Sequence, residues 1–181
     1  MASLLAIHMQ TVDLPEGTSL TRQEYYDLLG LLGDHTMKLQ SIYRSSRDGT
    51  TYSDVLRCVG GKTGLVFLIR KDQYVFGSFI SAGIQPPDEP TSGHWYGCDV
   101  WDFSLAGHFP EPTKIDIDDK NQCVSVAGRE GQVNAASVEI GGWLRLGREV
   151  GGDAPAADIR SCLQPAHPGP SCACGLHGGE G

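Results

Sequence analysis

The stretch from Ser41 to Ile80 constrains the fold more than any other part of this 181-residue chain. It reads SIYRSSRDGTTYSDVLRCVGGKTGLVFLIRKDQYVFGSFI and combines a polar turn, a short helix, a glycine break and two apolar strands. Thr51 and Asp54 have the spacing of a capping box, which predicts a helix from Tyr52 to about Val59. Gly60-Gly61 then ends the helix, because glycine accepts the conformations that follow a helix C-terminus at little cost.

Two apolar runs close this stretch and predict a β-hairpin. Gly64 to Ile69 is an unbroken apolar run, which fits a strand covered on both faces. Lys71-Asp72-Gln73 gives a three-residue connection, and Tyr74 to Ile80 returns antiparallel. Gly77 interrupts the return strand and indicates a bulge or a close approach of another backbone segment.

Upstream, the sequence predicts a helix from Arg22 to Leu32. Thr21 and Glu24 have capping-box spacing, and Gly33 is suited to the position just after the helix. Apolar residues recur at helical spacing along one face, so we expect this helix to pack on a sheet. Between it and the polar turn, the alternation from Lys38 to Arg44 predicts a half-buried strand.

Downstream of the hairpin, residues 83–97 contain three prolines and predict a loop. Alternation and turn residues predict five further short strands: Cys98–Leu105, Lys114–Asp118, Gln122–Ala127, Ala136–Ile140 and Trp143–Leu146. We expect Lys114–Asp118 and Gln122–Ala127 to form a hairpin. From Gly147 onward glycine, alanine, proline and serine dominate, which predicts a mostly disordered tail.

Composition excludes several classes of protein. The net charge of −8 and the absence of a Lys/Arg cluster argue against a nucleic-acid partner. No apolar run approaches the roughly 20 residues of a membrane-spanning helix. The N-terminus lacks the basic region and long apolar segment of a signal peptide, so we expect a cytoplasmic protein with mostly reduced cysteines, export being the alternative.

Three groups of residues suggest catalysis or metal binding only weakly. His94, Cys98 and His108 are candidate zinc ligands, but the second closely spaced pair of a structural site is missing. A Cys/His cluster lies in the tail, comprising His167, Cys172, Cys174 and His177. Gly60 to Thr63 resembles the end of a phosphate-binding loop, yet Leu56 occupies the place of the required glycine. Loop histidines, packed thiols such as Cys58 and a helix end explain these residues more simply.

Arg47 and Asp48 form the more informative pair. At the start of a helix Asp48 can accept backbone N–H bonds, and the helix dipole favours its charge. Arg47 could then make a bidentate ion pair with a carboxylate elsewhere in the fold. No second acid stands at a meaningful spacing for catalysis, so the sequence predicts a structural or partner-contact role.

The blocks Ser46-Arg47-Asp48-Gly49 and Phe76-Gly77 occur in the order and spacing of a known family. Together with the intervening helix, the strand Leu65 to Arg70 and the later block Trp101 to Leu105, they make the chain resemble the TLDc domain of the oxidation-resistance proteins. The resemblance is good from about residue 21 to 118.

This resemblance implies an α+β fold: a mostly antiparallel, two-sheet β-sandwich with a few short helices at its edge. We expect the TLDc-like domain to span residues 21–147. Composition and the lack of periodicity make residues 1–20 a partly ordered lead-in and residues 148–181 the tail. No counterpart of the family's closing strand is evident, which would leave an unpaired sheet edge. Ser46, Arg47, Asp48, Gly49, Phe76 and Gly77 are the family-signature residues, expected to be structural or to contact a partner.

The resemblance also implies function. Family members are linked to protection against oxidative damage, and several bind and regulate the vacuolar proton-pumping ATPase. No settled enzymatic activity goes with the family, and we expect this chain to need no cofactor or metal. The leading hypothesis is therefore a non-catalytic interaction domain with a protein partner. The alternatives are a cysteine-dependent redox or metal-assisted enzyme and a fragment without an independent role.

Overall fold

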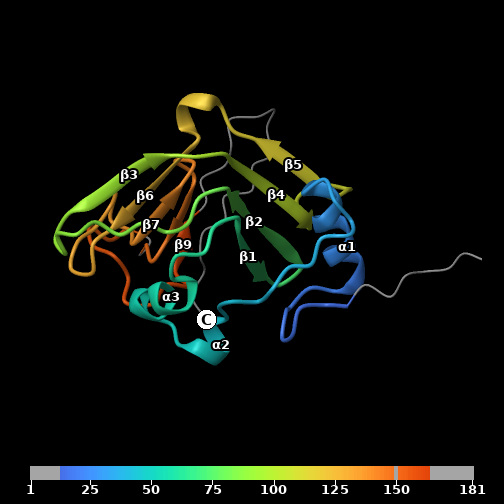
Figure 1. Cartoon of the computed structure of the whole chain (residues 1–181), viewed down its shortest axis with the longest axis horizontal. Helices are drawn as coiled ribbons and strands as arrows, with labels where there is room; N and C mark the ends of the chain where they lie inside the picture. The colour runs from blue at the N-terminus through green and yellow to red at the C-terminus, as the bar shows by residue number, and fades with distance from the viewer. Residues whose placement is uncertain (1–12, 149–150, 164–181) are drawn as a thin grey trace, which may run out of the picture. The chain divides into compact units, whose positions relative to one another are not determined.

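The computed structural model describes residues 13–148 and 151–163 (Figure 1). The chain divides into two compact units, one ending at Ser41 and the other beginning at Ile42. Among the described residues, no helix has both the length and the apolar character needed to cross a bilayer.

The first unit contains helix α1 (Arg22–Leu31), which confirms the predicted helix to within one residue. Its capping box is present: the Thr21 hydroxyl accepts the N–H of Glu24 at 3.2 Å, and the Glu24 carboxylate accepts the N–H of Thr21 at 2.7 Å. Gly33 follows with a φ of +86°, a conformation that glycine adopts readily. Tyr25 on the apolar face is buried, and its hydroxyl accepts the backbone N–H of Leu39 at 3.1 Å.

The prediction of a strand from Lys38 to Arg44 is wrong, because this segment pairs with no strand among residues 13–148 and 151–163. Its backbone donates hydrogen bonds to side chains instead. The Tyr25 hydroxyl accepts the N–H of Leu39, and the Asp48 carboxylate accepts the N–H of Arg44. The alternation also ends early, since residues 41–44 are all half-buried.

Helices α2 (Ser45–Asp48) and α3 (Tyr52–Val59) open the second unit. The predicted bounds of α3 are confirmed, and its buried face carries Val55, Leu56 and Val59. Gly60 ends α3 with a φ of +50°, so the glycine pair resembling a phosphate-binding loop is a helix terminus that leads into a strand.

The first sheet has the order β1-β2-β4-β5 and is antiparallel throughout. Its strands are β1 (Leu65–Lys71), β2 (Tyr74–Ile80), β4 (Val100–Ala106) and β5 (Thr113–Asp116). The β1–β2 hairpin is confirmed, but Lys71 pairs with Tyr74, so the connection has two residues rather than three. β1 is mostly half-buried rather than covered on both faces, because it lies at the edge of the sheet.

The second sheet has the order β3-β6-β7-β8-β9. Its strands are β3 (Gly93–Gly97), β6 (Cys123–Ala127), β7 (Val138–Ile140), β8 (Leu144–Leu146) and β9 (Cys162–Leu163). The expected loop therefore ends before residue 93, since its prolines all precede that point and residues 93–97 pair with β6.

The hairpin predicted between residues 114–118 and 122–127 is also wrong. β5 pairs with β4, whereas β6 pairs with β3 and β7, so the two strands belong to different sheets. The connection through the 3₁₀ helix η1 (Asp119–Asn121) carries the chain from one sheet to the other. Turn residues reveal where a strand ends, but they do not reveal which strand it pairs with.

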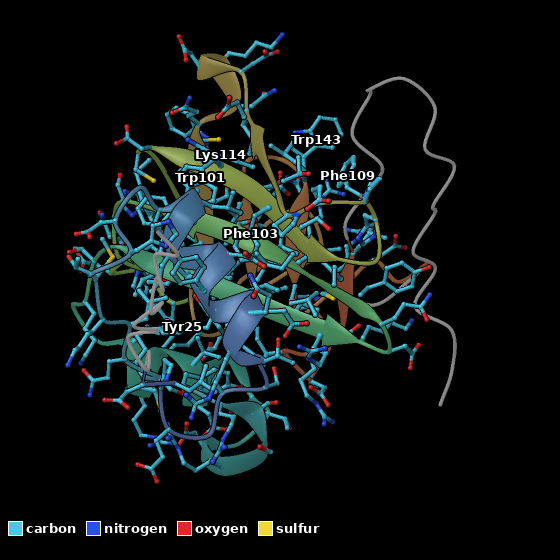
Figure 2. The ribbon with its side chains drawn as sticks, turned by 90° about the vertical axis from the view of Figure 1, so that its right-hand side faces the viewer. Tyr25, Trp101, Phe103, Phe109, Lys114 and Trp143 are labelled. Atoms are coloured by element: carbon cyan, nitrogen blue, oxygen red, sulfur yellow. The ribbon has the colours of Figure 1, made fainter. Side chains whose placement is uncertain are left out.

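A single hydrophobic core joins both sheets to the buried face of α3. It contains Val55, Leu56, Val59, Leu65, Ile80, Ile84, Val100, Ile117, Val124, Val126, Val138, Ile140, Leu144 and Ile159. On the opposite face of the first sheet, Trp101 stacks on Phe79 at 5.2 Å between centroids, and the Lys114 ammonium lies 5.0 Å from the Trp101 ring (Figure 2). The predicted α+β, mostly antiparallel two-sheet sandwich with short helices is confirmed.

The prediction of a disordered tail from residue 148 onward is wrong for residues 151–163. Ile159 is only 5% exposed within the core, and its N–H donates to the carbonyl of Thr50 at 2.8 Å. β9 pairs with β8 along the edge that was expected to lack a partner. The tail cysteines and histidines at 167, 172, 174 and 177 lie outside the described residues.

Replacing Ile159 with alanine is expected to lower the free energy of unfolding by about 2 kcal/mol, because it removes buried methyl groups and leaves a cavity. Urea denaturation of the full chain measures this. Asp153→Ala, at an exposed position of the same segment, is the control and should change stability by less than about 0.5 kcal/mol. Equal behaviour of the two variants would show that the segment does not pack on the core.

Candidate functional site

The signature residues at 46–49 form helix α2 and the glycine that ends it. The Asp48 carboxylate accepts the backbone N–H of Arg44 at 2.7 Å and so closes the helical turn from its far end. The Tyr43 hydroxyl donates to the Gly49 carbonyl at 2.8 Å and fixes the exit from the turn. Ser46 lies exposed on α2. The turn is thus held by contacts among residues close in sequence.

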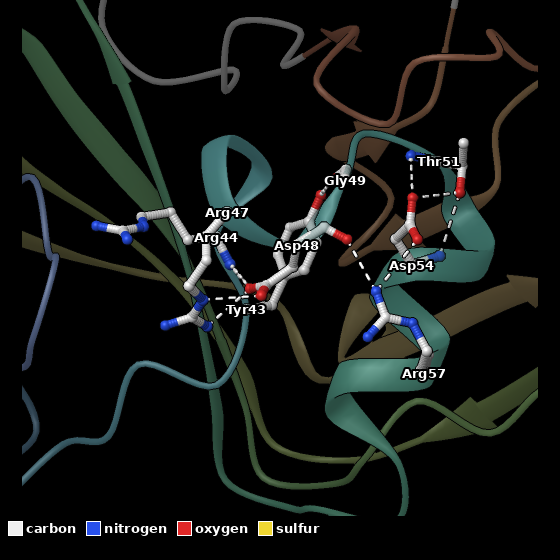
Figure 3. Close-up of polar contacts among 8 residues, drawn as sticks. All are labelled: Tyr43, Arg44, Arg47, Asp48, Gly49, Thr51, Asp54 and Arg57. Atoms are coloured by element: carbon white, nitrogen blue, oxygen red, sulfur yellow. Dashed lines mark hydrogen bonds and ion pairs between the residues drawn. The ribbon is translucent and has the colours of Figure 1, made fainter.

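Arg47 forms a bidentate ion pair with its neighbour Asp48, whereas the prediction placed its carboxylate partner elsewhere in the fold. Its Nε lies 2.8 Å from Asp48 Oδ1 and its Nη2 lies 2.7 Å from Oδ2, which makes a bidentate pair (Figure 3). The Asp48 side chain is 15% exposed and that of Arg47 is 40% exposed, so the pair is partly open to solvent rather than buried. Asp48 also accepts a hydrogen bond at the start of α2, whereas the prediction placed its hydrogen bonds at the start of the following helix.

Asp54 and Arg57 join this turn to α3. The Asp54 carboxylate accepts the N–H and the hydroxyl of Thr51 at 3.1 and 2.7 Å, completing the predicted capping box. Arg57 Nη2 donates to the Asp48 carbonyl at 2.9 Å and to Asp54 Oδ1 at 3.2 Å (Figure 3). The sequence interpretation missed Arg57, although its position three residues after Asp54 on a helix was a usable signal.

These contacts hold both acids in the charged form. Hydrogen bonds from the Arg47 side chain, with the N–H of Arg44, lower the pKa of Asp48 to about 2. Hydrogen bonds from Thr51, with that from Arg57, lower the pKa of Asp54. A general acid or base works best with a pKa near the working pH, so neither carboxyl suits proton transfer at neutral pH.

The Asp48 contacts predict an acid-dependent loss of stability. A carboxyl whose pKa falls from the ordinary 3.8 to about 2 on folding stabilises the fold above pH 3.8. That contribution disappears as the pH falls toward 2, because the folded state then binds the proton as well. We therefore expect Asp48→Asn to melt below the wild type at pH 7, with the difference shrinking through this window.

Melting temperatures of both proteins from pH 7 to pH 2 measure the effect. Arg47→Gln is the companion variant: it removes the main cause of the low pKa, so its acid transition should begin at higher pH than that of the wild type. A wild-type advantage over Asp48→Asn that stays constant down to pH 2 would contradict the prediction.

Phe76 and Gly77 lie in the central strand β2 of the first sheet, not at the turn. Phe76 is buried, and Gly77 leaves no room for a side chain beside β1: a Cβ there would overlap the Phe67 carbonyl oxygen. The predicted close approach of another backbone segment is confirmed at Gly77. The register of the β2–β4 pairing shifts between Val75 and Phe76, not at the glycine itself.

Beside this glycine lies a buried polar pair that the sequence interpretation missed. The Ser78 hydroxyl on β2 donates to Asp102 Oδ1 on β4 at 2.5 Å, and both side chains are fully buried. The two residues are register partners. No local signal finds such a pair, because its two residues lie 24 positions apart in sequence and meet only once β2 and β4 are aligned.

The weak metal candidates do not come together. His94 lies on β3 with its Nδ1 2.9 Å from the Gln85 carbonyl oxygen, while Cys98 follows β3. His108 lies after β4, 4.7 Å from the Tyr74 ring between centroids. Within residues 13–148 and 151–163, no three His, Cys, Asp or Glu side chains are grouped as metal ligands would be.

The cysteines of the described residues are reduced and half-buried, at positions 58, 98, 123 and 162. Burial raises the pKa of Cys98 and of Cys162. A raised pKa favours the thiol, whereas the nucleophile in cysteine chemistry is the thiolate.

The fold and the signature turn together define a class of protein: an antiparallel two-sheet sandwich whose charged turn is organised by capping and ion-pair contacts. Residues 16–139 match the family model of the TLDc domain, and the chain belongs to that family. The matched region runs from before α1 into β7, and β8 and β9 lie beyond it. No curated protein and no solved structure matches the chain.

Proposed function

We propose that this chain is a non-catalytic protein-interaction domain. The observation that carries the proposal is that Asp48 of the signature turn and Asp54 in the first turn of α3 are both engaged in hydrogen bonds that stabilise the local structure. Asp48 accepts three hydrogen bonds and Asp54 accepts bonds from Thr51 and Arg57, with pKa values shifted down. Side chains used in this way build a rigid surface and are poorly suited to turning over a substrate.

The redox-enzyme alternative is less favoured. A peroxide-reducing cysteine needs a thiolate, and burial shifts Cys98 and Cys162 toward the protonated thiol. Membership of the TLDc family supports a finer proposal: the domain acts in the cytoplasm, binds subunits of the vacuolar proton-pumping ATPase and contributes to protection against oxidative stress.

Binding of the purified full chain to the purified cytosolic sector of that ATPase tests the proposal. We expect saturable binding by biolayer interferometry, and no acceleration of peroxide consumption over a buffer blank. Variants with Cys58, Cys98, Cys123 or Cys162 replaced by serine should bind as the wild type does. A cysteine-dependent peroxide reaction would overturn the non-catalytic assignment, and absence of binding would overturn the choice of partner.

A further inference from the structure

Strand β3 is the least protected of the four sheet edges in the described chain. Proteins commonly protect edges by charge, by proline or by shortness, because an open edge pairs readily with another strand. β5 carries Lys114 and Asp116, β1 ends in Arg70 and Lys71, and β9 has only two residues. β3 reads Gly-His-Trp-Tyr-Gly and contains neither a formal charge nor a proline.

Two hydrogen bonds show which backbone groups of β3 face outward. The N–H of Cys98 donates to the Gln122 carbonyl at 3.2 Å, and the N–H of Gly128 donates to the Ser92 carbonyl at 2.8 Å. In the antiparallel register of β3 and β6, these bonds assign the even-numbered residues to the ladder. The N–H and C=O groups of Gly93, Trp95 and Gly97 therefore point away from β6, and all three residues are exposed.

The side chains of β3 are divided between two faces. His94 and Tyr96 are anchored on one face, where Tyr96 donates to the Gly83 carbonyl at 2.7 Å and His94 lies against the Gln85 carbonyl. Trp95 is on the other face and is 64% exposed, the most exposed large apolar side chain in the described chain. An anchored strand with an exposed tryptophan gives a binding surface that loses little freedom on binding.

The charges around β3 specify the occupant. Asp88 and Glu89 are exposed before the strand and Asp99 is exposed after it. The adjoining loop contributes Arg129 and Glu130, one charge of each sign. The surroundings of β3 are thus acidic at both ends, within a chain of net charge −8. They complement an extended segment with a central apolar residue and flanking lysines or arginines.

We propose that β3 is a strand-addition site, at which an extended apolar–basic segment of a protein partner pairs with Gly93, Trp95 and Gly97. The inference rests on the proposed interaction function and supplies its surface. Main-chain hydrogen bonds provide the affinity, and contact of one partner side chain with Trp95 fixes the register.

Selection of random dodecapeptides displayed on phage, with the full chain as bait, tests the site. Selected peptides should show alternating apolar residues with flanking Lys or Arg. Gly97→Pro removes an outward N–H without breaking a bond to β6, because proline is tolerated at such edge positions. Gly97→Ala is the matched control: its Cβ meets only the Gln122 carbonyl oxygen, at 3.8 Å.

Synthetic selected peptides should bind wild type and Gly97→Ala alike, and should lose about tenfold or more in affinity for Gly97→Pro and for Trp95→Lys. Melting temperatures confirm that all variants are folded, and Trp95→Lys keeps the test decisive if Gly97→Pro does not fold. Peptides that bind all variants equally, or a selection that yields none, overturn the proposal. Dimerisation of the full chain that Gly97→Pro abolishes would assign the edge to a second copy instead and also overturn it.

The same variants separate this site from the proposed function. If the ATPase sector binds wild type, Gly97→Pro and Trp95→Lys equally, the interaction function stands and β3 is not its surface. If the selected peptides depend on β3 while the ATPase sector does not bind, the strand-addition site stands and the choice of partner fails.

Discussion

Replacing Gly77 with alanine is expected to lower the free energy of unfolding by about 4 kcal/mol, the range of the most damaging single substitutions. Gly77 lies in the central strand β2, opposite Leu68 of β1 and Phe103 of β4. An added Cβ would overlap the carbonyl oxygen of Phe67 and lie 2.9 Å from Phe103 Cζ. The ring can move, but the carbonyl is part of the β1 backbone, so relief requires the two strands to separate.

Chemical denaturation of the full chain measures the effect. Gly61→Ala is the matched control, because Gly61 is exposed and an added Cβ would have no atom within 4 Å. That variant should stay within about 0.5 kcal/mol of the wild type. A Gly77→Ala protein as stable as Gly61→Ala would mean that the strands can part without loss, contrary to the packing described above.

Local chemistry explains which elements could be predicted from the sequence. Thr21 and Thr51 start helices through contacts with residues three positions away, so the sequence contains the whole interaction. The β1–β2 hairpin is likewise a neighbouring pair, joined by a two-residue turn. In each case the partner is adjacent in sequence, and the predictions were confirmed.

Pairing between distant segments explains the errors. The alternation that defines a strand shows which residues share a face but not which strand lies beside it, so β5 and β6 were assigned to one hairpin although they lie in different sheets. β9 has only two residues, too few to show any period, and its position depends on β8. The apolar character of Ile159 was visible, but a single residue in a Gly/Ala-rich segment gives no pattern.

The candidate site shows the same division. Capping by Asp54 is local and was predicted, whereas the partner of Arg47 was sought at a distance and proved to be its neighbour Asp48. The sequence interpretation considered only a carboxylate elsewhere in the fold as the partner of Arg47. Within the single helical turn of α2, the long arginine side chain folds back, so that its guanidinium reaches both carboxylate oxygens.

Gly49→Ala is expected to destabilise the chain by about 3 kcal/mol and to loosen the signature turn. Gly49 has φ +104° and ψ 168°, a region essentially restricted to glycine, and occupying it costs other residues about 1–3 kcal/mol. In addition, an added Cβ would overlap Asp54 Oδ2 and lie 2.6 Å from Asp54 Cγ. The new methyl group therefore displaces the carboxylate that caps α3, and the variant loses capping energy as well as backbone freedom.

A double-mutant cycle separates these two contributions. Gly60→Ala, at the other end of α3, also places alanine at positive φ, but its Cβ would have no atom within 4 Å, so it reports the backbone contribution alone. In an Asp54→Ala background the clash is absent, and the further cost of Gly49→Ala should be smaller than in the wild type, leaving the backbone contribution. An unchanged cost in that background would show that Gly49 acts through its backbone conformation only. The Asp54 carboxylate would then not be the reason that glycine is needed at position 49.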